Sequence, residues 1–229
     1  NSTLRDAIAI QGGGALHVAY GSQRFTNDLD FVWLGEPLSL ELLLNLVDSD
    51  KLGHSISSRI SKSDDRFVRA TYSVNAEKGF ISSFHLEGYA ASPLFVCNSV
   101  QLSTGSSINV ESPAEILLDK IVASLDRFEK RGAIKQTDIF DIHFILSLLK
   151  VQDFLLSDIV RKFASYAITI DESQLVGRLH TLIAYLSEKK ESVAAVLSKN
   201  LDVSSAEEFD TLKMVTSTIV FLERLAQSK

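Results

Sequence analysis

The pattern of apolar residues divides the chain into two parts. Up to about residue 110, short apolar or alternating segments are separated by glycine and polar residues, which predicts strands and short helices. From Pro113 onward apolar residues recur at helical spacing and glycine becomes rare. The pattern therefore predicts an α+β protein with a boundary near residue 110 and a helical C-terminal part.

The first part begins with a predicted strand, a glycine turn and a helix. Ala7–Ile10 is a short apolar strand that Gly12-Gly13-Gly14 should stop, and Ala15–Tyr20 has helical spacing. Asp28–Trp33 alternates and then becomes wholly apolar, as a strand does where one end leaves a core. Leu38–Val47 is predicted to be an amphipathic helix. Further strands are predicted at Ser55–Ile60, Phe67–Val74, Phe80–Glu87, Leu94–Val96 and Ile108–Val110.

The second part opens with a capped helix. Ser112 is the expected N-cap, Pro113 takes the first helical position and Glu115 the third, which is the reciprocal capping pattern. The next helix is predicted over Thr137–Leu149. The remaining helices are predicted at Val151–Tyr166, Asp171–Ser187, Lys189–Lys199 and Ser205–Gln227.

Composition and charge narrow the class of protein. The 229 residues are 45% hydrophobic and 23% charged, which is ordinary for a globular protein with a sizeable core. The net charge of -6 argues against a surface coated with phosphate-binding residues. Basic residues are nevertheless concentrated between Lys51 and Lys78 and again from Arg127 to Lys135. These segments are either sites for a polyanion or solvated loops and helix faces.

The cysteine content, the lengths of the apolar runs and the N-terminal residues indicate the cellular location of the protein. The single cysteine, Cys97, lies in an apolar run and excludes a disulfide within the chain. No apolar run reaches the roughly 18 residues that a membrane span needs. We expect a cytoplasmic protein without a membrane partner. Because the chain starts at Asn1 without an initiator Met or signal-peptide pattern, we also expect a trimmed chain or a fragment.

The main chemical hypothesis concerns two carboxylates. Asp28 and Asp30 are two residues apart on a predicted strand, so both side chains project from the same face. Such a pair can chelate Mg²⁺, which takes one or two protein carboxylates and completes its shell with water and phosphates. The alternative is that both aspartates only end a strand and face water.

The glycine run strengthens the metal hypothesis. Gly12, Gly13 and Gly14 follow a predicted buried strand, where they can expose backbone N–H groups to a phosphate. A simple tight turn is the alternative for this run alone. The order of strand, glycines, helix and D-x-D strand is rarer than either piece, and it places the aspartates opposite phosphates bound by the glycines.

The chain resembles a known family over these motifs. Residues 12–31, GGGALHVAYGSQRFTNDLDF, are similar to the signature of the AbiEii-type nucleotidyltransferase toxins, in the DNA polymerase β-like superfamily. Arg24 and Thr26 stand where that family has an Arg and a Ser or Thr. Glu115–Lys120 and Asp138–Asp141 are similar to its E-x-L-x-x-K and R-D-x-x-D elements.

The resemblance implies a fold and a set of site residues. It implies a polymerase β-like sheet with flanking helices over residues 1–110, followed by a helical bundle over 111–229 that contributes Lys120 and Asp138 to the active site. It makes the glycines, Arg24 and Thr26 nucleotide-binding residues. Lys120 could instead extend from a buried helix to solvent, and Arg24 could pair with a nearby acid.

The resemblance also implies a third metal-binding carboxylate on a neighbouring strand. Glu87 is the candidate, because Phe84 and Leu86 are apolar and leave His85 and Glu87 together on the polar face. A solvent-facing Glu87 without a role is the alternative. The chain departs from the family at Thr137, where a basic residue is usual, and in lacking the helix that precedes the glycine motif.

The function implied is metal-dependent transfer of a nucleoside monophosphate from a nucleoside triphosphate, such as ATP, to an acceptor. Two Mg²⁺ ions would be held by Asp28, Asp30 and Glu87. The family resemblance implies a toxin that acts on tRNA or another RNA, or on protein, and is silenced by a cognate antitoxin. Two alternatives remain, namely a small-molecule nucleotidyltransferase of the antibiotic-modifying kind and a non-catalytic nucleotide-binding relative.

Overall fold

The computed structural model of the chain describes residues 6–26, 28–35, 55–75, 81–103, 105–149, 154–201 and 209–228. The helix predicted at Leu38–Val47 lies outside these residues. Contacts divide the chain into two compact units, one of residues 1–21 and 25–111 and the other of residues 22–24 and 112–229. We call them the sheet unit and the helical unit.

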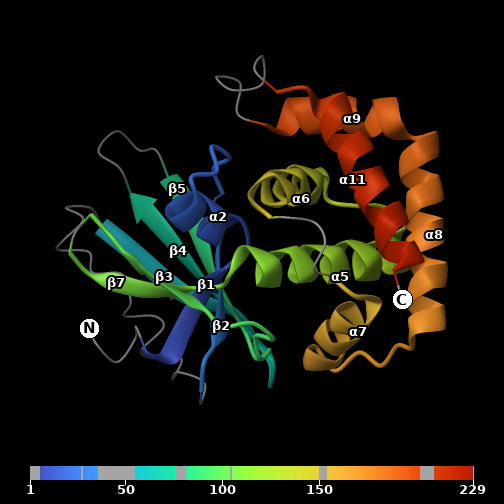
Figure 1. The fold of residues 1–229 in the computed structure, drawn as a ribbon. Helices are drawn as coiled ribbons and strands as arrows, with labels where there is room; N and C mark the ends of the chain where they lie inside the picture. The colour runs from blue at the N-terminus through green and yellow to red at the C-terminus, as the bar shows by residue number, and fades with distance from the viewer. Residues whose placement is uncertain are drawn as a thin grey trace. The chain divides into compact units, whose positions relative to one another are not determined.

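The described part of the sheet unit contains one mixed sheet of seven strands, in the order β3-β4-β5-β2-β1-β7-β6 (Figure 1). Strand β1 is antiparallel to β2 and parallel to β7, while β2 is parallel to β5. The strands are β1 (Ile8–Gln11), β2 (Asp28–Trp33), β3 (Ser55–Ser63), β4 (Phe67–Asn75), β5 (Ile81–Tyr89), β6 (Asn98–Gln101) and β7 (Ser107–Val110).

One face of the sheet carries an apolar core. Phe31, Tyr72 and Leu86 are buried on β2, β4 and β5, and alternate with polar residues that point to the other face. The rings of Phe31 and Trp33 meet edge to face at 4.8 Å. This packing needs Gly88, because a Cβ atom there would lie 2.7 Å from the Phe31 ring. The core therefore fixes which face of β2 and β5 is polar.

The glycine run does not form a separate turn, which corrects the prediction. Helix α2 (Gly12–Tyr20) begins at Gly12, directly after β1 ends at Gln11. The change of direction is made by Gly12 alone, whose φ of +64° suits a residue without Cβ. The three glycines consequently form the first turn of the helix.

A second correction concerns the strand predicted at Leu94–Val96. These residues lie outside the strands of the sheet, and Val96 is 88% exposed. The strand is β6 at Asn98–Gln101, which pairs with β7 at the edge of the sheet. An edge strand is selected by its hydrogen-bonding partner, so hydrophobicity was a poor guide to its position.

The helical unit is built around α5, which contacts α6, α7 and α8 (Figure 1). Ser112 caps α5 as predicted, accepting a hydrogen bond from the Glu115 backbone N–H at 3.2 Å. Within the described residues, no helix is both long and apolar enough for a membrane span. The helices are α5 (Pro113–Arg131), α6 (Gln136–Leu148), α7 (Leu156–Ser165), α8 (Glu172–Glu188), α9 (Lys190–Asn200) and α11 (Thr211–Gln227).

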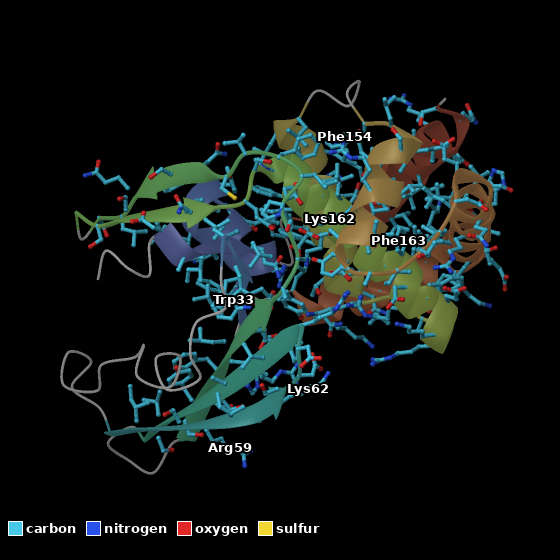
Figure 2. The ribbon with its side chains drawn as sticks, turned by 90° about the horizontal axis from the view of Figure 1, so that it is seen from below. Trp33, Arg59, Lys62, Phe154, Lys162 and Phe163 are labelled. Atoms are coloured by element: carbon cyan, nitrogen blue, oxygen red, sulfur yellow. The ribbon has the colours of Figure 1, made fainter. Side chains whose placement is uncertain are left out.

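The core of the helical unit includes a buried cation. Lys162 of α7, labelled in Figure 2, has no exposed side-chain surface. It pairs with Glu115 and, at 2.8 Å, with Asp119, both on α5. Tyr166 donates a hydrogen bond to Asp119 at 2.7 Å. A buried charge is tolerated only when it is paired in this way, so the cluster fixes α7 against α5.

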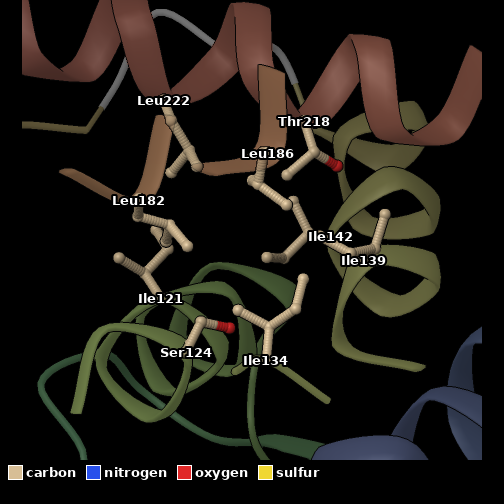
Figure 3. A pocket seen from close by; sticks show the side chains of 9 residues that line it. All are labelled: Ile121, Ser124, Ile134, Ile139, Ile142, Leu182, Leu186, Thr218 and Leu222. Atoms are coloured by element: carbon tan, nitrogen blue, oxygen red, sulfur yellow. The ribbon is translucent and has the colours of Figure 1, made fainter. Parts of the chain in front are cut away.

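The interior of the helical unit contains a small void. A void of about 10 Å³ lies between α5, α6, α8 and α11 and is lined mainly by aliphatic side chains (Figure 3). Ser124 and Thr218 supply its two hydroxyl groups. This volume is about that of one water molecule by the same measure, so the void is a packing feature and not a ligand site.

Candidate active site

The two aspartates lie at the start of β2, on the polar face of the sheet. Both are partly exposed, whereas Phe31 on the opposite face is buried. The hydroxyl of Thr26 lies 3.3 Å from both the backbone N and the backbone O of Asp28. Thr26 therefore fixes the backbone where the strand begins.

The carboxylate of Asp30 lies against the first glycine of α2. Gln11 and Asp30 are partners in the β1–β2 ladder, and Gly12 follows at once. A Cβ atom on Gly12 would lie 2.9 Å from Asp30 Oδ2. A helix N-terminus with its unsatisfied N–H groups favours negative charge, so the glycines and the aspartate share one polar site.

Glu87 lies beside Asp30. The two residues are register partners in the parallel ladder of β2 and β5, so their side chains share a face. Glu87 accepts hydrogen bonds from Arg69 Nε at 2.7 Å and from the Tyr89 hydroxyl at 2.9 Å. Burial is the largest cause that raises the pKa of the Tyr89 hydroxyl, and the negative charges of Asp30 and Glu87 raise it further. Two carboxylates therefore act on one partly buried hydroxyl.

Within the helical unit, charged residues form a chain of ion pairs of alternating sign. Arg24 binds Asp141 through two hydrogen bonds of 2.8 Å, from Nε and Nη2. Lys120 lies 2.7 Å from Asp141 and 3.0 Å from Asp138. Arg127 in turn lies 2.5 Å from Asp138. Three cations are thus held by two buried carboxylates.

The ion pairs keep Lys120 and Asp141 charged. Burial alone would lower the pKa of Lys120, but Asp141 and Asp138 outweigh it and hold that pKa above its usual value. Burial likewise opposes ionisation of Asp141, and Lys120 and Arg24 overcome it, so the pKa of Asp141 is lowered. Counted over these five groups alone, three positive charges face two negative ones.

Comparison with known proteins assigns the family. A family model described as the nucleotidyl transferase AbiEii toxin of type IV toxin–antitoxin systems matches residues 1–213. The chain belongs to the AbiEii family. This confirms the family resemblance and makes the chain a member of a family of nucleotidyltransferase toxins. No curated protein matches the chain in a sequence search.

Solved structures support the fold of this AbiEii chain. JHP933 from Helicobacter pylori is 18% identical with a TM-score of 0.61, over 98% of this chain and 86% of that one. A candidate nucleotidyltransferase from the same species is 21% identical with a TM-score of 0.64, over 98% and 88%. The α+β fold expected from the sequence, a nucleotidyltransferase sheet with a helical bundle, is thereby confirmed.

The predicted site residues of the AbiEii chain fall into two groups. The sheet unit brings together the glycines, Asp28, Asp30 and Glu87, with Thr26 next to Asp28. The helical unit brings together Lys120, Asp138 and Arg24, the last supplied by residues 22–24. Arg24 forms the ion pair with an acid that the sequence left open as its alternative role.

Two members of the ion-pair chain were missed as site residues. Asp141 is fully buried in α6 between Phe140 and Ile142, and its place in an apolar helical segment was a signal that it must be paired. Arg127 lies seven residues after Lys120 on α5, a spacing that puts both on one helical face. Arg127 places a positive charge beside Asp138, whereas Thr137, at the position where a basic residue is usual in the family, does not.

Proposed function

We propose that the protein transfers a nucleoside monophosphate from a nucleoside triphosphate to the end of an RNA, in a Mg²⁺-dependent reaction. The observation that carries this proposal is the approach of the Asp30 carboxylate to Gly12, with Asp28 two residues away and Glu87 beside it in register. Oxygen ligands of this kind suit Mg²⁺.

The residues of the sheet unit fit the metal. Asp28 and Asp30 would hold it, and Glu87 would join them if Arg69 releases its carboxylate. Bound Mg²⁺ would neutralise phosphate charge and make the acceptor hydroxyl a better nucleophile. The N–H groups at the start of α2 would bind the triphosphate, with Gly12 leaving room for Asp30.

The residues of the helical unit would supply positive charge. We propose that Lys120 contacts a phosphate as a point charge while Asp138 and Asp141 orient it. In the reaction the acceptor hydroxyl releases its proton to solvent, its oxygen bonds to the α-phosphorus, and the bond from that phosphorus to pyrophosphate breaks. Stabilisation of the charge on the leaving pyrophosphate would be the main contribution of these cations.

The family supports a toxin role and a cognate antitoxin. We further propose a cytoplasmic toxin with tRNA as its acceptor. The test is incubation with each labelled triphosphate, Mg²⁺ and total tRNA, followed by a gel. Labelled tRNA that requires Mg²⁺ is the expected result.

The matched variant for this test is Asp28→Ala. Because Asp28 is partly exposed, its loss should leave thermal melting unchanged and abolish incorporation. Normal incorporation by the variant would refute the assignment of Asp28. Incorporation that persists without RNA would support a small-molecule acceptor, and triphosphate binding in calorimetry without any product would support a non-catalytic relative.

A further inference from the structure

The polar face of the sheet extends beyond the aspartates. Two cross-strand rows connect β3 to β2, because each residue in a row is the register partner of the next. Partners across strands share a face, so the rows lie on the face opposite the apolar core. The rows are Arg59–Thr71–His85–Asp28 and Lys62–Arg69–Glu87–Asp30.

Each row is basic at its outer end and acidic at β2. Arg59 and Lys62 lie on β3, an edge strand of the sheet (Figure 2), and Arg69 lies on β4. We call these three residues the basic strip. Arg59 is exposed, and the side chains of Lys62 and Arg69 are 60% and 42% exposed. Solvent therefore reaches the basic strip, although Lys62 lies 3.7 Å from Asp64 and Arg69 pairs with Glu87.

A β-bulge places Lys62 in this strip. The register shifts between Ile60, which pairs with Ala70, and Lys62, which pairs with Arg69. Without the extra residue Lys62 would project from the opposite face. The Lys62 ammonium and the Arg69 guanidinium both lie over the Phe67 ring, at 4.7 Å and 5.7 Å from its centroid. The local structure thus directs two cations to the face that carries the aspartates.

From these observations we infer that the basic strip is the docking surface for the phosphate backbone of a single-stranded RNA acceptor. This inference rests on the proposed function and names the site that receives its acceptor. Strand spacing puts β3 about 14 Å from β2, at roughly 4.8 Å per strand. The terminal hydroxyl would lie at Asp28 and Asp30, and the preceding phosphates would lie over Arg59, Lys62 and Arg69. An acceptor much smaller than a few nucleotides cannot span that distance.

The test compares two double variants of the full chain. Arg59→Gln with Lys62→Gln neutralises the strip. Arg161→Gln with Lys189→Gln is the control, because these residues of the helical unit are also exposed, at 63% and 51%, lie outside both basic segments, and change the charge by the same amount. The probe is a fluorescein-labelled 12-nucleotide single-stranded RNA with a free 3′ hydroxyl, and its binding is measured by anisotropy across a salt series.

The strip variant should bind the RNA about 20-fold more weakly at 0.1 M salt, with a slope of log affinity against log salt reduced by about 1.4, since each phosphate contact on a single strand contributes about 0.7. The control should retain the wild-type slope. Equal affinity of both variants would overturn the inference. So would tighter binding of polyglutamate than of RNA, which would assign the strip to an acidic protein partner.

Failure of this inference is separable from failure of the proposed function. If tRNA labelling continues with unchanged KM in the strip variant, the docking surface is wrong and the transferase proposal stands. If no labelling occurs with any acceptor but RNA binding still depends on the strip, the docking surface stands and the transferase proposal fails. Aggregation of the strip variant with unchanged affinity of its monomer would show that the charges only protect an edge strand, which overturns the inference.

Discussion

At the residue scale, the most constrained position is Gly12. Its φ is +64° and its Cα faces the Asp30 carboxylate, so both backbone and space exclude a side chain. A left-handed conformation costs a non-glycine residue roughly 1–2 kcal/mol. The cost to function should be larger, because the added Cβ displaces the carboxylate that we propose binds metal.

Gly12→Ala should therefore lose about 100-fold in turnover while unfolding only roughly 1–2 kcal/mol more easily, since small displacements of reacting groups have effects of that size. Gly177→Ala is the control, because a Cβ atom there meets nothing within 4 Å. It lies inside α8 and should stabilise the protein by about 1 kcal/mol without changing turnover. The measurements are urea unfolding and labelled-nucleotide incorporation. Full activity of Gly12→Ala would contradict the proposed site.

Asp141 is the second residue whose role can be measured. Asp141→Asn leaves Lys120 and Arg24 with a neutral partner, and removing one member of a buried ion pair costs about 3–5 kcal/mol. Because the pKa of Asp141 is lowered below its usual 3.8, the stability it contributes is complete above that pH and is lost as pH falls through the lower, folded value.

The melting temperatures of wild type and Asp141→Asn, measured from pH 7 to pH 2.5, should therefore differ by a constant amount above pH 4 and converge below it. Asp126→Asn is the control, because that carboxylate pairs with the exposed Lys130. A difference that stayed constant down to pH 2.5 would show that Asp141 does not titrate as a paired carboxylate.

At the element scale, the sequence predicted most of the secondary structure. Helices α7 and α11 begin later than predicted, because residues 154–155 and 209–210 are not helical. The two errors in the sheet unit share a cause. Strong periodicity located both ends of β2 and α8 to within one residue, and the capping residues located the start of α5. The glycine run and β6 were misplaced because their conformations depend on one backbone angle and on one edge partner. Neither the backbone angle nor the edge partner can be predicted from the spacing of hydrophobic residues. The aspartate pair could be predicted because alternation with a period of two shows which residues share one face of a strand. The ion pairing of Asp141 could not be predicted in this way, because it depends on contacts between residues far apart in the chain.

The pairing of α5 with α7 gives a prediction at this scale. Lys162→Met leaves Glu115 and Asp119 without their shared cation and should cost about 3–5 kcal/mol in urea unfolding. Adding Glu115→Gln and Asp119→Asn removes the stranded charges, so the triple variant should be more stable than the single one. A triple variant less stable than the single variant would show that the charges themselves are not the cause of the loss.

At the scale of the whole molecule, the chain enters the helical unit twice. Residues 22–24 belong to it by contact, although the flanking segments belong to the sheet unit. Arg24 is the member of this short segment that pairs with Asp141, so the helical unit is not a continuous stretch of sequence.

A fragment of residues 112–229 should therefore be less stable than the same unit in the full chain, because it lacks Arg24. In that fragment Asp141→Asn should cost less than in the full chain, since one of its two cationic partners is already absent. Urea unfolding of the fragment and the full chain, each with and without Asp141→Asn, gives the two costs. Equal costs would show that Arg24 does not contribute to the pair.

The discontinuity also constrains recombination among relatives. A crossover at residue 112 would join the N-terminal half of one protein to the C-terminal half of another, and so would combine an arginine and a buried aspartate of different parentage. Chimeras should fold well when positions 24 and 141 carry opposite charges, as Arg24 and Asp141 do here. Where the two parents differ at these positions, a crossover before Ser22 keeps both positions from one parent and should be tolerated better than a crossover at residue 112.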